Sequence, residues 1–217
     1  MSGTLFKVIS YLFYPLLMLT YAALLVFWAN PYLFQAQSGK ALQVHFLSLF
    51  FTTFLLPAVA IVMMKSLGLI KSIHMQDRQD RIGPLIVTGV FYIWAFRNMI
   101  SNPDIPQPLT IFTLGICIVL GLCFLINLFS KISLHAAGAG GMIVIAALIW
   151  QFFAPYGFAI GSWIMDSSII VALILIFAGL TGSARLYLKA HNPSEIMGGY
   201  FIGIAGQLIA FFILYRF

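Results

Sequence analysis

His191 and Glu195, four residues apart at the start of a long apolar run, are the residues of this sequence best suited to chemistry. A carboxylate at that offset can reach an imidazole and fix its tautomer, which leaves the second ring nitrogen free as a nucleophile or base. Asn192, Pro193 and Glu195 also suit the N-cap, first and third positions of a helix. We therefore predict that His191 stands at a helix start, where unpaired N–H groups and the helix dipole favour an anion.

Further polar residues could act together with this pair. His135 follows Ser133, a suitable N-cap for another apolar segment, and could donate a proton to a leaving group. Basic side chains could hold the oxygens of a phosphoryl group as negative charge grows on them. The candidates for this role are Arg185, Lys71, Arg78 and Arg81. Together these residue types indicate phosphoryl transfer.

The composition indicates what kind of fold must position these side chains. Hydrophobic residues make up 62% of the 217 residues and charged residues 7%, whereas an ordinary soluble domain is about 45–50% apolar and about 25% charged. We therefore predict an all-α, polytopic transmembrane helical bundle that forms a single domain over residues 1–217, and expect it in a bacterial cytoplasmic membrane. The net charge of +6 suits the headgroups of bilayer lipids or an anionic ligand, and no basic tract indicates nucleic acid.

Apolar runs long enough to cross a bilayer, which takes about 20 residues, predict six or seven spans. They cover residues 8–29, 42–66, 84–100, 109–130, 136–153, 163–181 and 194–216. The 84–100 run is the shortest, and six spans result if it only packs against the others. With seven spans, the polar segments 65–83, 131–135 and 183–192 share one membrane face, because an even number of spans separates each from the next.

Each of these three polar segments leads into the N-terminal end of a predicted span. The helix starts are marked by Pro84, by Ser133 and by Asn192 with Pro193. Three such ends on one face, joined by arginine and lysine side chains, predict a binding pocket for an anion, of which phosphate is the natural example. If Lys71, Arg78, Arg81 and Arg185 bind a ligand, four cations remain on this face against three on the other, so the positive-inside rule does not decide the orientation.

Other residues have plainer interpretations. Lone cationic side chains near span ends usually anchor to lipid headgroups, which is our interpretation of Lys65, Lys131 and Lys189. We interpret Asp166 as an interfacial cap and His45 and His74 as incidental. Five glycines are predicted to serve close helix packing: Gly138, Gly140, Gly141, Gly199 and Gly203. The two cysteines, Cys117 and Cys123, read as small core residues, so that neither a disulfide nor a metal site is indicated.

The run from Ala184 to Glu195 resembles the third signature of the type 2 phosphatidic acid phosphatase superfamily. That signature reads Ser-Arg, five residues, His, three residues, Asp, and Arg185 and His191 stand at its spacing. Ala184 replaces the signature serine, although Ser183 lies one position earlier, and Glu195 replaces the aspartate. The likeness therefore holds for the arginine and the histidine, and it departs at the serine and the aspartate of the signature.

Two earlier segments are similar to the remaining signatures of that family. The second signature, Pro-Ser-Gly-His, keeps its serine and histidine in Ser133 and His135. The first signature, Lys, six residues, Arg-Pro, has Lys71 and Arg78 at its spacing but lacks the proline. Arg81, which stands three residues before Pro84, is a second candidate for the signature arginine. The three segments cover about a tenth of the chain and occur in the family's order.

The resemblance implies a metal-independent phosphatase of phosphorylated membrane lipids that needs no cofactor. In that family the third-signature histidine attacks phosphorus to form a phosphohistidine, which water then cleaves. The resemblance assigns the attack to His191, its orientation to Glu195, and protonation of the leaving alcohol to His135. Binding of the phosphoryl group would fall to Ser133, Arg185, Lys71 and Arg78 or Arg81. Several lipids present such a phosphate, among them phosphatidic acid, phosphatidylglycerol phosphate and a polyprenyl diphosphate.

Two other classes of function are alternatives. A non-catalytic binder or flippase of phosphorylated lipids would use the same anion pocket, and the replaced signature residues favour it. A prenyl-transferring membrane enzyme is a weaker alternative, which rests on the slight likeness of residues 77–81 to an Asp-rich, metal-chelating motif. Such enzymes need paired motifs of this kind, and the sequence offers one.

Overall fold

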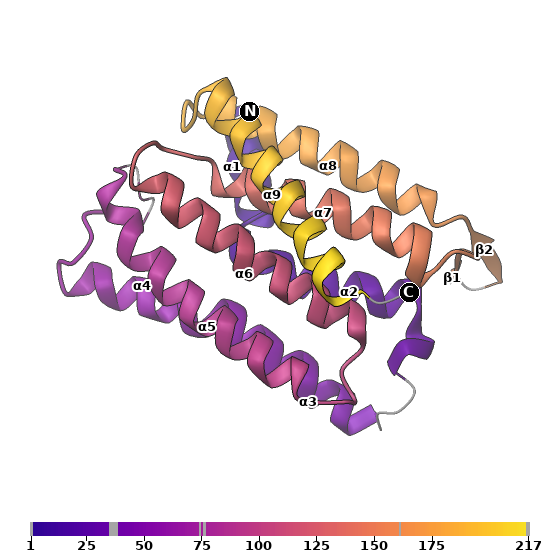
Figure 1. Cartoon of the computed structure of the whole chain (residues 1–217). Helices are drawn as coiled ribbons and strands as arrows, with labels where there is room; N and C mark the ends of the chain where they lie inside the picture. Colours follow the sequence, from indigo (N-terminus) through magenta and orange to yellow (C-terminus); the bar gives the residue numbers. More distant parts are fainter. Residues whose placement is uncertain (1, 35–38, 74, 76, 161, 216–217) are drawn as a thin grey trace.

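The computed structural model describes residues 2–34, 39–73, 75, 77–160 and 162–215, and most of its helices run side by side in one elongated bundle (Figure 1). The α-helices are α1 (Ser2–Leu12), α2 (Met18–Ala29), α3 (Gly39–Phe50), α4 (Leu56–Ser66), α5 (Ile82–Ile100), α6 (Gln107–Asn127), α7 (Leu134–Leu148), α8 (Ser168–Tyr187) and α9 (Pro193–Leu214). The shorter elements are the 3-10 helices η1 (Pro15–Leu17), η2 (Pro31–Phe34) and η4 (Gln79–Arg81), the π-helices η3 (Phe51–Leu55) and η5 (Ile149–Phe153), and the strands β1 (Phe158–Ile160) and β2 (Trp163–Met165).

Seven segments of the described chain are helical, long and apolar enough to cross a bilayer, which confirms the predicted all-α, multi-pass membrane class. They are Gly3–Ala29, Gly39–Ser66, Gln79–Ile100, Gln107–Asn127, Leu134–Phe153, Ser168–Tyr187 and Pro193–Leu214. The short apolar run 84–100 belongs to one of these segments. The structure therefore has the seven-span arrangement rather than the six-span one.

The predicted start of the sixth span at residue 163 is wrong. Trp163–Met165 forms β2, which pairs with β1 in a small antiparallel hairpin. The helix α8 begins only at Ser168, whose backbone N–H donates to a carboxylate oxygen of Asp166 at 2.7 Å. This bond satisfies one N–H of the first helical turn, so Asp166 caps the span start as predicted. His74 and residue 216, the last basic position of the chain, lie outside the described residues.

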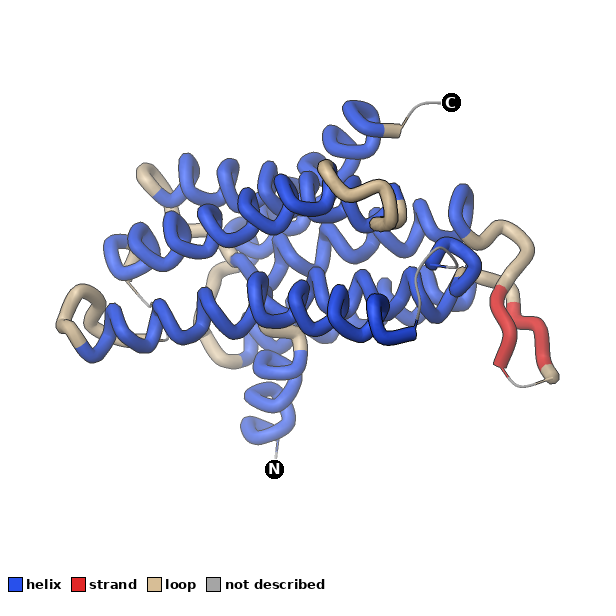
Figure 2. The backbone as a smooth tube through the Cα atoms, turned by 90° about the horizontal axis from the view of Figure 1, so that it is seen from below, coloured by secondary structure: helices blue, strands red, loops and turns tan. Residues whose placement is uncertain are grey.

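The first span is bent, because its interior contains Pro15. Proline has no N–H and disfavours the helical conformation at the preceding residue, and Tyr14 is accordingly extended at φ −67° and ψ 133°. The helix α1 therefore turns away from the direction of α2, projects from the bundle (Figure 2) and packs chiefly on α8. The bend brings Ser10, in the last turn of α1, to the bundle end where α7 begins.

The helix α9 packs against α7 at backbone distance. A Cβ atom at Gly203 would lie 2.0 Å from the carbonyl oxygen of Ala137, and one at Gly199 would lie 2.6 Å from that of Ser133. Gly140 makes the same kind of contact from α7. Small residues allow this approach between membrane helices, and the predicted packing role of these three glycines is confirmed. The contact fixes the relative position of the two helices whose starts carry the site histidines.

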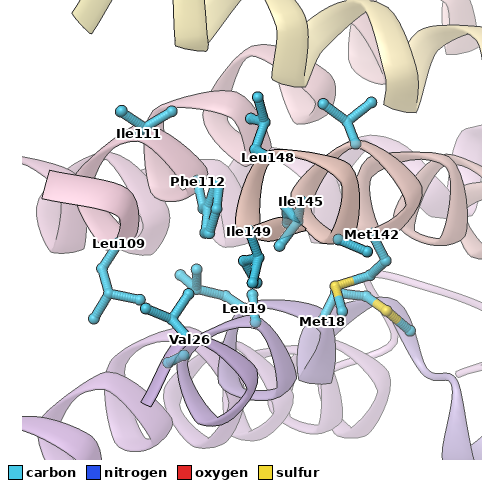
Figure 3. Close-up of a cluster of buried hydrophobic side chains, with 14 of the residues drawn as sticks. Met18, Leu19, Val26, Leu109, Ile111, Phe112, Met142, Ile145, Leu148 and Ile149 are labelled. Carbon is cyan, nitrogen blue, oxygen red and sulfur yellow. The ribbon is translucent and has the colours of Figure 1, made fainter. Parts of the chain in front are cut away.

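A buried apolar core lies between α2, α6 and α7 (Figure 3). Its labelled members are Met18, Leu19, Val26, Leu109, Ile111, Phe112, Met142, Ile145, Leu148 and Ile149. Gly138 and Gly141 face side chains rather than backbone, since added Cβ atoms would lie 3.0 Å from Met18 and 3.4 Å from Gln207. This core holds α2, α6 and α7 together, while α5 packs on α6 and α9 packs on both α6 and α7.

Replacement of Gly203 by alanine should destabilise the bundle, because the new Cβ would overlap the carbonyl oxygen of Ala137. Overpacking of this severity costs about 2–3 kcal/mol, and we expect a lower midpoint of thermal unfolding in detergent. Gly179→Ala is the matched control, since a Cβ there meets nothing within 4 Å. Equal unfolding midpoints of the two variants would contradict the close packing of α9 on α7.

Candidate functional site

Three polar segments meet at one end of the bundle, at the left in Figure 1. They precede α5, α7 and α9, and hydrogen bonds join them directly. Arg81 Nη1 donates to the carbonyl oxygen of Ile132 at 2.7 Å, and Lys131 Nζ donates to that of Ala190 at 3.1 Å. The shared face that was predicted from the number of intervening spans is therefore observed.

His191 and Glu195 form the hydrogen bond that their spacing predicts. His191 Nδ1 lies 2.6 Å from Glu195 Oε2, and the imidazole is almost completely buried. A carboxylate can only accept, so Nδ1 carries the proton and Nε2 has the free lone pair of a neutral ring. Glu195 thereby fixes the tautomer in which Nε2 can act as a nucleophile.

The N-cap of α9 holds this pair in place. Asn192 Oδ1 accepts hydrogen bonds from the backbone N–H of Glu195 and from the hydroxyl of Ser194, both at 2.8 Å. Asn192 Nδ2 in turn donates to Glu195 Oε1 at 3.3 Å. Asn192 is thus the N-cap and Pro193 follows it at the helix start, as predicted. The two oxygens of Glu195 are divided between the cap and His191.

The environment of His191 keeps its imidazole neutral. Burial, followed by the positive charges of Arg81 and Arg185, lowers the pKa of His191 to about 4, although the hydrogen bond to Glu195 acts in the opposite direction. The ordinary pKa of histidine is about 6.5. Nε2 is therefore unprotonated, as a nucleophile requires, throughout the neutral pH range.

Arg81 is the arginine of the first polar segment that reaches this site. Its side chain is buried, with Nε donating to the carbonyl oxygen of Met75 at 2.9 Å in addition to the bond to Ile132. It interacts electrostatically with Glu195 and Arg185. Of the two arginines that the sequence left as alternatives, Arg81 therefore lies beside His191.

Arg78 and Lys71, the other candidates from this segment, point elsewhere. Arg78 is exposed, and its Nη1 donates to the carbonyl oxygen of Phe129. Lys71 Nζ pairs with Asp77 at 3.0 Å on the surface, and its backbone N–H donates to Asp80 Oδ2 at 3.1 Å. The two carboxylates of the Asp-rich segment therefore hold the Lys71 loop. Among the described residues, no group of three or more His, Cys, Asp or Glu could hold a metal ion.

His135 and Arg185 are both held by Ser10 of α1. His135 Nε2 lies 3.1 Å from the carbonyl oxygen of Ser10, which can only accept, so this ring nitrogen carries a proton. Arg185 Nη1 donates to the Ser10 hydroxyl at 3.4 Å, while Arg185 Nε is buried and has no partner among the described residues. His135 interacts electrostatically with Arg185 and His191, so the four residues form one cluster.

Ser133 acts as a helix cap in this structure. Its hydroxyl accepts a hydrogen bond from the backbone N–H of Ala136 at 3.3 Å, as the N-cap prediction requires, and the residue is fully buried. Its backbone N–H donates to the carbonyl oxygen of Glu195 at 3.2 Å. Ser133 lies behind the site and does not line the cavity described next.

A cavity of about 930 Å³ opens onto this cluster. His135 and His191 line it, and five basic side chains form what we call its cationic end: Lys7, Arg81, Lys131, Arg185 and Lys189. None of the described residues that line it is acidic. A concentration of positive charge in a cavity wall without acidic side chains, beside two helix starts, is suited to binding an anion.

Three of these cations were not predicted as site residues. Lys131 and Lys189 were interpreted as headgroup anchors, and Lys7 directly precedes the first predicted span. Lys189 has a positive φ of 50°, a conformation that normally favours glycine at the end of a helix. Strained backbone positions tend to cluster at functional sites, but the strain at Lys189 is visible only in the structure.

The cluster brings together the types of group that nucleophilic substitution at phosphorus requires. His191 Nε2 supplies the lone pair, Arg81 and Arg185 supply charge for the non-bridging oxygens, and His135 supplies a nearby N–H donor. Comparison with models of known families, with curated proteins and with solved structures finds no match to this chain.

The lowered pKa of His191 can be measured by nuclear magnetic resonance of histidine-labelled protein in detergent micelles. We expect the ring of His191 to stay neutral as the pH falls through about 6.5 and to take up a proton only near 4. The unfolded chain takes up this proton first, so the same difference lowers the stability of the fold as the pH falls below about 6.5. A titration midpoint at or above the ordinary value would contradict the burial and the charges assigned to this site.

Proposed function

We propose that this protein is a metal-independent phosphatase of membrane lipids, a divergent relative of the type 2 phosphatidic acid phosphatases, in a bacterial cytoplasmic membrane. It hydrolyses a phosphate monoester or diphosphate of a lipid through a phosphohistidine at His191. The observation that carries this proposal is the bond of His191 Nδ1 to Glu195 in a cavity lined by five cations. In that geometry Nε2 is the free nitrogen of a neutral imidazole that lines the cavity in which a phosphoryl group would be held.

The reaction follows in two steps. In the first, His191 Nε2 forms a bond to phosphorus while the bond from phosphorus to the lipid oxygen breaks, and the leaving oxygen takes a proton from protonated His135. In the second, water attacks phosphorus, the phosphorus–nitrogen bond breaks, and His135 regains a proton from the attacking water. Arg81 and Arg185 stabilise the negative charge that builds up on the phosphoryl oxygens in both steps.

The membrane location of the site supports a lipid as the substrate. The cationic end of the cavity lies at the starts of helices that are apolar enough to cross the bilayer. A lipid could therefore enter laterally, with its chains among the helices and its phosphate at the helix starts. If the cations only anchored the protein to lipid headgroups, the buried positions of Arg81 and His191 would have no explanation.

Binding of a lipid phosphate without turnover is the second candidate. It is favoured by one observation, the bond of His135 Nε2 to the carbonyl oxygen of Ser10, because this bond occupies the proton that the first step requires. A protein with this arrangement would bind the phosphate and release nothing. The assay that follows separates the two functions.

Conversion of His191 to alanine should abolish phosphate release, because the nucleophile is lost. Release from phosphatidic acid, phosphatidylglycerol phosphate and polyprenyl diphosphate is measured in detergent micelles with a metal chelator present. We expect the rate on the best of these lipids to fall by at least about a thousandfold.

His45→Ala is the matched control, since His45 belongs to α3 and does not line the cavity. Its rate should equal that of the wild type. Full activity of His191→Ala, or activity that chelator removes, would overturn the proposal. Binding of these lipids by a folded wild type that releases no phosphate would establish the second candidate.

Exchange of Arg81 for lysine should weaken phosphate binding, whereas the same exchange at Arg78 should not. Lysine cannot reproduce the planar set of donors with which arginine holds phosphate oxygens and backbone carbonyls together. We expect the dissociation constant of inorganic phosphate, measured by calorimetry, to rise at least about tenfold in Arg81→Lys. An equal loss in Arg78→Lys would show that the exposed arginine is the one that binds.

A further inference from the structure

The proton of His135 is engaged in a structural hydrogen bond. His135 Nε2 donates it to the backbone carbonyl oxygen of Ser10 at 3.1 Å, and this bond joins α7 to the last turn of α1. A neutral imidazole with its proton on Nε2 has no other proton to give. A second proton would place another positive charge beside Arg185, with which His135 interacts electrostatically. The site is therefore best suited to a reaction whose leaving group needs no proton.

The two kinds of lipid phosphate differ in what their leaving group needs. Cleavage of a monoester releases an alkoxide, which is about as basic as hydroxide, the anion of a water molecule with a pKa of about 16. Cleavage of a diphosphate releases a phosphate group, whose second pKa is about 6. The first must take up a proton as it departs, whereas the second departs as an anion. Cleavage of a lipid diphosphate therefore leaves the bond between His135 and Ser10 intact.

One face of α1 lies against the cavity beside His135. Lys7, Ser10 and Tyr11 line the cavity, and their spacing of three and four residues places them on the same side of the helix. Tyr14, between the end of α1 and Pro15, also lines it, and its ring meets that of His135 edge-on with the centroids 5.7 Å apart. We call Lys7, Ser10, Tyr11 and Tyr14 the α1 wall.

Contacts with α8 hold the α1 wall in place. The ring of Phe6 packs on that of Tyr187 with the centroids 4.3 Å apart, and the ring of Phe13 packs on that of Phe177 at 5.1 Å. Tyr187 and Phe177 both belong to α8, which also carries Arg185. The wall is therefore positioned by packing within the protein and does not need a ligand to form.

The cations of the cationic end adjoin both histidines. Lys131 bonds the carbonyl oxygen of Ala190, the residue before His191, and Lys189 precedes His191 by two residues. Lys7 instead belongs to the α1 wall, one helical turn before Ser10. Positive charge is therefore present next to the nucleophile and also next to His135, where a leaving group would depart.

Lys7 is the charge that the α1 wall contributes. Its side chain is exposed, and no hydrogen bond or ion pair joins it to another described residue. The ammonium group stands on a flexible four-carbon stem, so it can reach the space beside Ser10 and His135. The charge of Lys7 is therefore available to a ligand in the cavity.

We propose that the substrate is a lipid diphosphate and that Lys7 binds its second phosphate group, the one attached to the lipid. The inference rests on the proposed function. His191 attacks the terminal phosphorus, the bond from that phosphorus to the bridging oxygen breaks, and the electron pair stays on the bridging oxygen. The lipid monophosphate departs as an anion whose growing charge Lys7 stabilises, and His135 transfers no proton in this step.

The first test compares two kinds of substrate and ligand on the wild type in micelles. A lipid diphosphate should be hydrolysed with a kcat/KM at least about a hundredfold above that of the monophosphate of the same chain, since the monophosphate lacks a general acid. Binding is measured by calorimetry with an alkylphosphonate and with an alkyl ester of methylenediphosphonate, in which carbon replaces the bridging oxygen. We expect the diphosphonate to bind at least about tenfold more tightly, because of the added charged contact.

Two variants make the test specific to Lys7. Lys7→Gln should raise the dissociation constant of the diphosphonate about tenfold and change that of the monophosphonate far less. Lys65→Gln is the matched control, because Lys65 bonds the carbonyl oxygen of Lys71 and does not line the cavity. It should match the wild type with both ligands. Equal losses on both ligands in Lys7→Gln would show that Lys7 only attracts anions in general, and would overturn its role.

The results distinguish this inference from the proposed function. Phosphate release from monophosphates as fast as from diphosphates would support the phosphatase and overturn the inference. Tighter binding of the diphosphonate without release from the lipid diphosphate would support the second phosphate site and overturn the phosphatase. Failure of both phosphonates to bind would overturn both. The comparison on the wild type decides the substrate class if Lys7→Gln fails to fold.

Discussion

Glu195 is the residue on which the candidate site depends, because its polar atoms join three parts of the structure. Its backbone N–H bonds the cap residue Asn192, its carboxylate bonds His191 at 2.6 Å, and its carbonyl oxygen accepts from Ser133 at 3.2 Å. The same residue therefore bonds the cap in the first turn of α9, orients the imidazole and ties α9 to the start of α7. A change in any of these bonds would move the two histidines relative to each other.

The bilayer explains why the polar residues of the site lie at helix ends. Inside hydrocarbon, a charge without a partner is costly, so the cations of the three polar segments lie at the helix ends. There Arg81 satisfies two backbone carbonyls, and Arg185 bonds Ser10 but keeps a buried Nε without a partner among the described residues. The site thus combines excess positive charge with an N–H donor that has no partner among the described residues. Binding of an anion would satisfy both, which favours binding.

Much of this could be predicted from local sequence. The apolar runs predict the spans, and the cap of α9 and the bond from His191 to Glu195 follow from spacing within one helical turn. The choice between Arg78 and Arg81 could not be predicted, because it depends on which side chain the loop folds inward. The sixth span was placed too early because an apolar run does not distinguish the strand Trp163–Met165 from a helix.

Contacts between residues far apart in the chain also could not be predicted from the sequence. Ser10 reaches His135 because Pro15 turns α1 away from α2. The sequence around Pro15 predicts a bend, but it does not show which residues the bend brings together. Gln207 is polar in a run of apolar residues, but its bond to the carbonyl oxygen of Phe112 appears only when α6 and α9 pack together. In both cases the informative contact joins residues far apart in the chain.

The central claim is that His191 itself carries the phosphoryl group during turnover. It is tested most directly by stopping the reaction on a lipid phosphate in alkali, where phosphohistidine survives, and locating the phosphoryl group by mass spectrometry. We expect phosphorylation of His191 at Nε2, since Nδ1 is engaged by Glu195. Phosphate release without phosphorylated His191 at any reaction time, or with the phosphoryl group on another residue, would contradict it.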